Sequence, residues 1–306
     1  FKIMKEKELI QIIKSTLNSE YIGDDCAYLP DLGITVTQDS LVEDVHFSMK
    51  YTNAYKLGWK SAMVNISDVC ASGANPVYLT IALSLPKNIK ADFVEEFYKG
   101  AKDACEDVKI VGGDITGSEK IFISVTAIGS TKGRKISSRS HAKAGYKIIV
   151  SGKHGSSGAG LISLIKGLKY PDFIEAHLIP KAQRKFSEQI AVNALYDYAM
   201  MDTSDGLADA LYQIADASNV IMKIDFEKIP YDKNIEKFSD WKDLILFGGE
   251  DYQLVAAVPE ELLKNISDYT IIGEVIERNN KSDGKIIIDG KHYSDIDNKL
   301  YNHFEE

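Results

Sequence analysis

Residues 34–47, ITVTQDSLVEDVHF, constrain the fold most, because they join a strand pattern directly to a group of acids. Apolar and polar residues alternate at the start of this stretch, which predicts a half-buried strand that ends at Asp39. Glu43, Asp44 and the imidazole of His46 follow within a few residues. Oxygen ligands gathered where a strand ends favour Mg²⁺, and Mg²⁺ is typical of phosphate chemistry.

A single acidic cluster is more often a solvated loop, but similar acid-bearing segments recur along this chain. Each lies at an expected strand end, glycine turn or helix terminus, where a side chain can reach a cleft. One of them, Asp68, shares a helical stripe with Leu57 and Val64, so it is expected to point inward. An inward acid needs a partner or a metal ion. The recurring acids are Asp24, Asp25, Asp39, Asp68, Asp114, Asp202, Asp205, Glu250 and Asp251.

Composition excludes several classes of function. The 306-residue chain carries a net charge of −9, which argues against a nucleic-acid partner because phosphate backbones require basic surface. No apolar run reaches the roughly 18–20 residues of a membrane helix, and no signal peptide is visible. The three cysteines, Cys26, Cys70 and Cys105, form no zinc or disulfide pattern, so we expect a cytoplasmic protein.

The chain is long enough for two domains, and a basic, serine-rich stretch at 132–143 is the expected linker. We therefore predict an α/β domain over 1–135 and an α+β domain over 136–306. A glycine- and serine-rich loop at 152–160 could hold phosphate through its backbone, although it does not match a P-loop. Helices are expected over 5–17, 53–71, 93–108 and 207–218, and a Gly-Gly turn at 112–113. Strands are expected over 81–85, 109–111, 121–128, 146–151, 221–226, 244–247, 252–258, 270–275 and 285–289.

Taken together, the acidic motifs resemble the thiamine-monophosphate kinase family. They occur in the family's order and cover nearly the whole chain, at residues 22–25, 38–47, 65–76, 111–114, 201–207 and 247–252. The resemblance implies a two-domain fold of the aminoimidazole ribonucleotide synthetase-like type, with N-terminal strands that form a barrel across a homodimer. It also implies an ATP site between the domains, near the dimer interface.

The resemblance further implies that ATP and thiamine monophosphate give ADP and thiamine diphosphate by direct in-line transfer, with several Mg²⁺ ions. The attacking group would be a phosphate oxygen of the substrate, already ionised at neutral pH, so no general base is assigned. The implied Mg²⁺ ligands are Asp24, Thr37, Gln38, Asp39, Asp68, Asp114, Asp202 and Asp205. The implied ATP contacts are Gly113, Asp114, Arg139 and Ser204, and the implied thiamine contacts are His46, Glu250 and Tyr301.

Two other functions fit the same inventory. An aminoimidazole ribonucleotide synthetase-like ligase or cyclase shares the acidic metal-binding segments and the use of ATP. A nucleotide-binding regulatory protein without turnover could keep every one of these acids.

Overall fold

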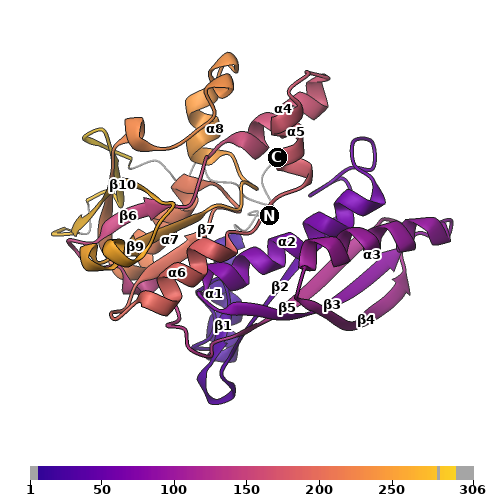
Figure 1. The fold of residues 1–306 in the computed structure, drawn as a ribbon, viewed down its shortest axis with the longest axis horizontal. Coiled ribbons are helices and arrows are strands. Elements are labelled where there is room, and N and C mark those ends of the chain that lie inside the picture. Colours follow the sequence, from indigo (N-terminus) through magenta and orange to yellow (C-terminus); the bar gives the residue numbers. More distant parts are fainter. Residues whose placement is uncertain (1–5, 281–282, 294–306) are drawn as a thin grey trace.

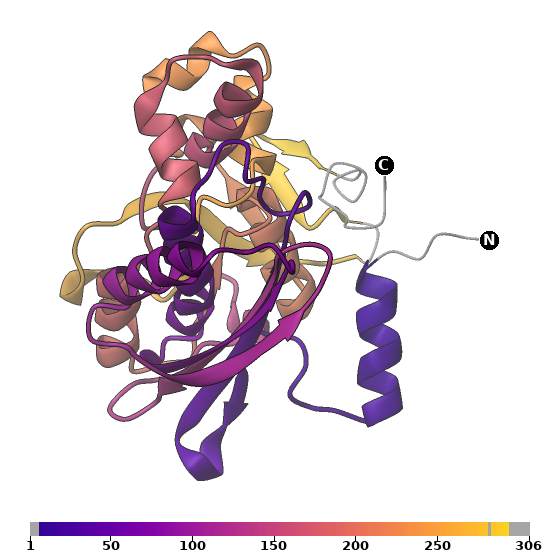
Figure 2. The same ribbon diagram turned by 90° about the vertical axis from the view of Figure 1, so that its right-hand side faces the viewer.

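The structure is a computed structural model that describes residues 6–280 and 283–293. Its strands form one five-stranded and one seven-stranded sheet, with helices packed against both (Figure 1). A first helix, α1 (Glu6–Leu17), stands beside this body (Figure 2). In the part of the chain so described, neither sheet closes into a barrel.

The five-stranded sheet has the order β1-β2-β5-β3-β4, antiparallel except for the parallel β3–β4 pair. Strand β2 runs past the expected end at Asp39 to Val42, because Leu41 and Val42 continue the ladder with Ile123 and Phe122. The strands are β1 (Ala27–Leu29), β2 (Ile34–Val42), β3 (Asn75–Leu85), β4 (Lys109–Gly117) and β5 (Phe122–Ser130).

Two helices, α2 (Ala54–Ala71) and α3 (Ala91–Cys105), cover one face of this sheet (Figure 1). The helix α2 begins as expected, because the Asn53 side chain accepts a hydrogen bond from the Lys56 N–H at 2.9 Å. The two helices approach closely at Gly58, where an added side-chain carbon would lie 1.9 Å from the Phe97 carbonyl oxygen. This face of the sheet is therefore a tightly packed core.

The seven-stranded sheet has the order β12-β11-β8-β10-β6-β9-β7, with only the β11–β8 pair parallel. Its central strands are buried on both faces, so alternate residues enter different cores: Ile149 of β6 faces one, and Ile148 and Val150 face the other. The strands are β6 (Lys147–Val150), β7 (Ala199–Asp202), β8 (Val220–Ile224), β9 (Leu254–Val258), β10 (Thr270–Glu277), β11 (Ile286–Ile288) and β12 (Lys291–His292).

The expected strand over 244–247 is wrong, because these residues form the last turn of helix α8 (Trp241–Phe247). The Leu244 N–H donates to the Asp240 carbonyl, which continues a helical ladder. A four-residue apolar run fits either a strand or a helix, so its periodicity could not decide between them.

The other helices of this half are α4 (Ser156–Lys166), α5 (Pro171–Leu178), α6 (Arg184–Asn193) and α7 (Leu207–Ser218). Short 3₁₀ segments lie at Pro30–Leu32, Arg139–His141, Phe226–Lys228, Lys233–Lys237 and Glu260–Asn265.

The two halves share an apolar core that crosses the predicted boundary at 135/136. Residues of α2 such as Leu57 and Ile66 belong to the same core as Met200 of β7 and Leu254 of β9. The helix α2 is thus held between the two sheets, while the boundary itself stays a prediction. Among residues 6–280 and 283–293, no helix combines the length and apolar character needed to cross a bilayer.

Candidate functional site

A cavity of about 1020 Å³ lies between the two halves, and residues from both line it. Such a volume is at the upper end of the usual range for ligand sites. Ten of the residues expected at the site contribute to its lining: Asp24, Thr37, Gln38, Asp39, His46, Asp68, Arg139, Ser204, Asp205 and Glu250. Sequence positions more than 200 residues apart are thereby brought to one place.

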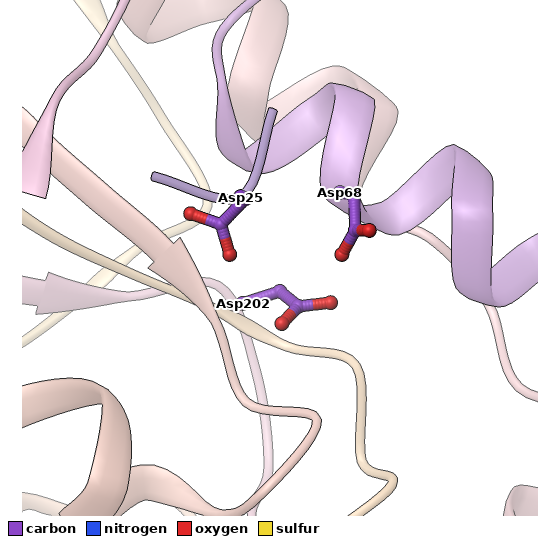
Figure 3. A group of neighbouring side chains, drawn as sticks. All are labelled: Asp25, Asp68 and Asp202. Atoms are coloured by element: carbon purple, nitrogen blue, oxygen red, sulfur yellow. The ribbon is translucent and has the colours of Figure 1, made fainter. Parts of the chain in front are cut away.

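Three carboxylates point toward one another beside this cavity (Figure 3), and two of them, Asp25 and Asp68, belong to its lining. Asp25 comes from the loop before β1, Asp68 from α2 and Asp202 from the end of β7. One oxygen of each lies within 4.8 Å of the others. We call these three residues the aspartate triad.

Hydroxyl groups from β2 and α2 hold two of the triad carboxylates. The Thr37 hydroxyl donates to Asp68 Oδ2 at 2.8 Å. The Ser67 hydroxyl donates to Asp202 Oδ2 at 2.6 Å, and the Asp202 side chain is nearly inaccessible. On β2, the Asp39 N–H donates to Asn65 Oδ1 at 3.0 Å, which ties this strand to α2.

Burial and mutual repulsion raise the pKa values of these acids. Burial, and then the charge of Asp25, raise the pKa of Asp39 to about 6. Burial and the charge of Asp25 likewise raise the pKa of Asp202 to about 7. The pKa of Asp68 is raised well above its usual range by burial and then by Asp39 and Asp202. Such a group of acids is stable only when it is protonated or neutralised by a cation.

The donor set fits Mg²⁺, because hard carboxylate oxygens converge from three elements. A positive group contacts the triad: the Arg139 Nη2 lies 3.1 Å from Asp25 Oδ1. Its Nη1 also donates to Gln213 Oε1 at 2.6 Å, so side chains hold both ends of the guanidinium.

The triad contains Asp25, whereas the sequence pointed to Asp24. The Asp24 carboxylate instead accepts hydrogen bonds from the Arg139 N–H at 2.7 Å and the Ser138 hydroxyl at 3.2 Å. The two adjacent side chains thus take different directions: Asp25 enters the triad, whereas Asp24 anchors the 3₁₀ turn. The adjacent acids were visible in the sequence, but their orientation was not.

The Gln38 side chain lies on the other face of the sheet from its neighbours. Thr37 and Asp39 pair with the buried Ala127 and Val125, whereas Gln38 pairs with Thr126. The Thr126 hydroxyl donates to Gln38 Oε1 at 3.1 Å. The Gln38 side chain is therefore turned away from the triad. A metal ion at the triad could be contacted by the backbone of Gln38 but not by its side chain.

Gly113 and Asp114 do not line the cavity. Asp114 pairs with Ala82 on the outer face of the sheet, opposite to Asp39, and β4 is separated from β2 by two strands. Three strand spacings amount to roughly 14 Å. Gly113 has a packing role, because an added side-chain carbon there would lie 1.8 Å from the Ile81 carbonyl oxygen.

Beyond the triad, the cavity is bounded by Glu250, His46 and Tyr51. The Val42 N–H donates to His46 Nδ1 at 3.0 Å, so a neutral His46 ring carries its proton on Nε2. The predicted thiamine contact Tyr301 lies outside the described residues. The amides at the start of α4 are not open to a phosphate, because Gly155 and Ser157 donate to the Asp251 carboxylate.

The chain is similar to known proteins along most of its length. Residues 23–131 match the model of "AIR synthase related protein, N-terminal domain" and residues 143–284 that of the C-terminal domain. The thiamine-monophosphate kinase of Aquifex aeolicus (strain VF5) is 38% identical over 317 residues, covering 99% of each chain.

The chain belongs to the thiamine-monophosphate kinase family. The family member of Bacillus subtilis (strain 168) is 32% identical over 307 residues, and the match covers 93% of each chain. The solved structure of AaThiL complexed with AMPPCP and TMP has a TM-score of 0.88 and 37% identity, covering 98% of this chain and 97% of that one. This thiamine-monophosphate kinase family member thus has the expected two-domain α/β fold.

Proposed function

We propose that the protein transfers the γ-phosphoryl group of ATP to thiamine monophosphate, giving ADP and thiamine diphosphate. The observation that carries the proposal is the aspartate triad, assembled from three distant elements, with Asp25 and Asp68 lining one large cavity. The relation to AaThiL, which was solved with AMPPCP and TMP, supports the choice of substrates.

The chain's own groups suit a reaction between two polyanions. Several Mg²⁺ ions held by Asp25, Asp68, Asp202 and Asp39 would neutralise the donor and acceptor phosphates. The Arg139 guanidinium is held at the cavity wall beside Asp25, where it can bind a phosphate oxygen. The acceptor phosphate is ionised at neutral pH, so the protein's task is in-line positioning rather than proton removal.

Release of ADP tests the proposal. We expect release in the presence of ATP and Mg²⁺ to depend on thiamine monophosphate, with thiamine diphosphate as the second product. Release that ignores thiamine monophosphate but responds to formylglycinamidine ribonucleotide would favour the ligase or cyclase. ATP binding without release under either condition would favour a regulatory protein.

Affinity for the metal should rise with pH. The pKa values of about 6 for Asp39 and about 7 for Asp202 are raised, so both acids hold protons below those values and compete with the ion. Each displaced proton costs up to about tenfold in affinity per pH unit below the pKa. Titration with Mn²⁺ followed by electron paramagnetic resonance should show tighter binding at pH 8 than at pH 5.5. Equal affinity at both pH values would contradict metal binding by these acids.

We also propose that two copies form a homodimer, whose strands close the barrel that the family resemblance implies. Exposed apolar side chains gather on the outer face and free edge of the five-stranded sheet: Tyr78 (42%), Val111 (56%), Ile115 (65%) and Phe122 (36%). An exposed apolar surface on an edge strand favours a partner. In this arrangement Asp114 would act from the interface, which accounts for its distance from the triad within one chain.

The variant Ile115→Asp should shift the protein from dimer to monomer in light scattering coupled to size exclusion, because it places a charge in the interface. Leu195→Asp is the matched control, since Leu195 is 82% exposed and lies outside this sheet. A wild-type protein that is monomeric at all concentrations would contradict the dimer.

The cytoplasmic location stays a prediction.

A further inference from the structure

A buried lysine lies on the same helix as Asp68, away from the triad. Lys60 of α2 is 4% exposed, and its Nζ lies 2.9 Å from Glu250 Oε1. A lysine buried to this extent is costly unless it is paired. The pair joins α2 of the first half to the loop between α8 and β9 of the second.

A histidine holds the other oxygen of the same carboxylate. His177 of α5 places Nδ1 3.3 Å from Glu250 Oε2 and 3.0 Å from the Ser157 hydroxyl. Burial and the charge of Lys60 lower the pKa of His177 to about 4, so its ring is neutral. With the proton on Nδ1, the ring donates toward Glu250 and the Ser157 oxygen.

The backbone around Glu250 is fixed as well. Glu250 has a left-handed φ of 64°, which is uncommon outside glycine, and its N–H donates to the Ser204 carbonyl at 2.6 Å. The next residue, Asp251, accepts hydrogen bonds from the Gly155 and Ser157 amides at the start of α4. Strained backbone that its surroundings hold in this way is typical of functional sites.

The carboxylate of Glu250 is therefore held from two sides and still has acceptor positions open to a ligand. It is 26% exposed and lines the cavity, and a carboxylate has about four acceptor positions, of which Lys60 and His177 take two. Although burial raises the pKa of Glu250, Lys60 and His177 lower it below the ordinary value, so the group stays ionised. An ionised, oriented acceptor at this wall suits a cationic, hydrogen-bond-donating heterocycle.

We propose that Lys60 and His177 are positioning residues, which hold the Glu250 carboxylate in register with the aspartate triad for recognition of the substrate's cationic heterocycle. This inference rests on the proposed function. The helix α2 sets the register, because Lys60 and Asp68 are eight residues apart on one rigid element, or about 12 Å along its axis. Neither residue need touch the transferred phosphoryl group.

The test is steady-state kinetics of Lys60→Met. We expect the KM for thiamine monophosphate to rise roughly tenfold to a hundredfold, the effect of one lost charged hydrogen bond. The KM for ATP and kcat should change less than about threefold. Lys56→Met, one turn earlier on α2, makes the same chemical change away from Glu250 and should behave as wild type.

Two further variants separate positioning from a general structural effect. Lys60→Arg keeps the charge with a different geometry, so it should fold even if Lys60→Met does not, and should give an intermediate KM. In a Glu250→Gln background, Lys60→Met should add no further rise, because Lys60 acts through Glu250. Equal effects on both KM values, or multiplied effects in the double variant, would overturn the inference.

A failed proposed function would look different. It would show as a wild-type protein without ADP release that depends on thiamine monophosphate. The thermal unfolding midpoints of the wild type, Lys60→Met, Glu250→Gln and the double variant then decide whether the contact exists. If the two side chains form a pair, the double variant loses less stability than the sum of the two single losses. Strictly additive losses would overturn the positioning of Glu250 by Lys60.

Discussion

Replacing Asp39 by Asn should abolish turnover while leaving the fold intact. Asp39 lies on β2 beside the triad, and its backbone N–H, which bonds to Asn65, is unchanged by the substitution. The lost carboxylate removes negative charge that would bind Mg²⁺, whose charge neutralisation in the transition state is worth several kcal/mol. We expect kcat to fall at least about 10³-fold, since each 1.4 kcal/mol is a factor of ten.

Asp44→Asn is the matched control for this variant. Asp44 belongs to the same acidic stretch, but it is half exposed and pairs with Lys120 at 3.1 Å on the surface. Exposed pairs of this kind contribute little. ADP release should stay within about twofold of wild type in Asp44→Asn, and near-normal release in Asp39→Asn would contradict a metal-binding role for Asp39.

Replacing Asp68 by Asn should inactivate the enzyme and yet stabilise the metal-free protein. Without a cation, burial and then the charges of Asp39, Asp202 and Asp25 raise the pKa of Asp68, so folding at neutral pH must pay either for its charge or for the proton that it takes up. The amide of Asn keeps an oxygen that can accept the hydrogen bond from the Thr37 hydroxyl, so the packing is preserved. Each kcal/mol recovered should raise the melting temperature in EDTA by roughly 2–4 °C.

The same variant should lose most of the stabilisation that Mg²⁺ gives the wild type. Ligands that bind only the folded state raise its stability by mass action, and a weakened site removes that gain. Differential scanning calorimetry in EDTA and in Mg²⁺ measures both effects. A lower melting temperature in EDTA would mean that Asp68 is stabilising without a metal, contrary to the account.

Much of the fold followed from periodicity and capping. The helix after Asn53 was predictable because a capping residue and a long apolar stripe agree, and α2 does begin there. The helix α8 was mistaken for a strand because four apolar residues carry no period of their own. The extension of β2 to Val42 depends on pairing with β5, a contact 80 residues away that local pattern does not contain.

The site was predictable as a set of acids but not as a geometry. Motif order identified the acidic segments. Which side chains face the triad, Asp25 rather than Asp24, and Thr37 and Asp39 rather than Gln38, depends on the path of the backbone. Lys60 had a usable signal, because it lies three residues after Leu57 on the inward side of α2. His177 had none, since a lone histidine on a short helix does not reveal its neighbours.

The most direct test of the account is the anomalous scattering of Mn²⁺ in crystals grown with an ATP analogue and thiamine monophosphate. We expect metal peaks within coordination distance of the Asp25, Asp68 and Asp202 carboxylates, with both ligands' phosphates on the same ions. Phosphates bound elsewhere, with no metal between these three side chains, would contradict it.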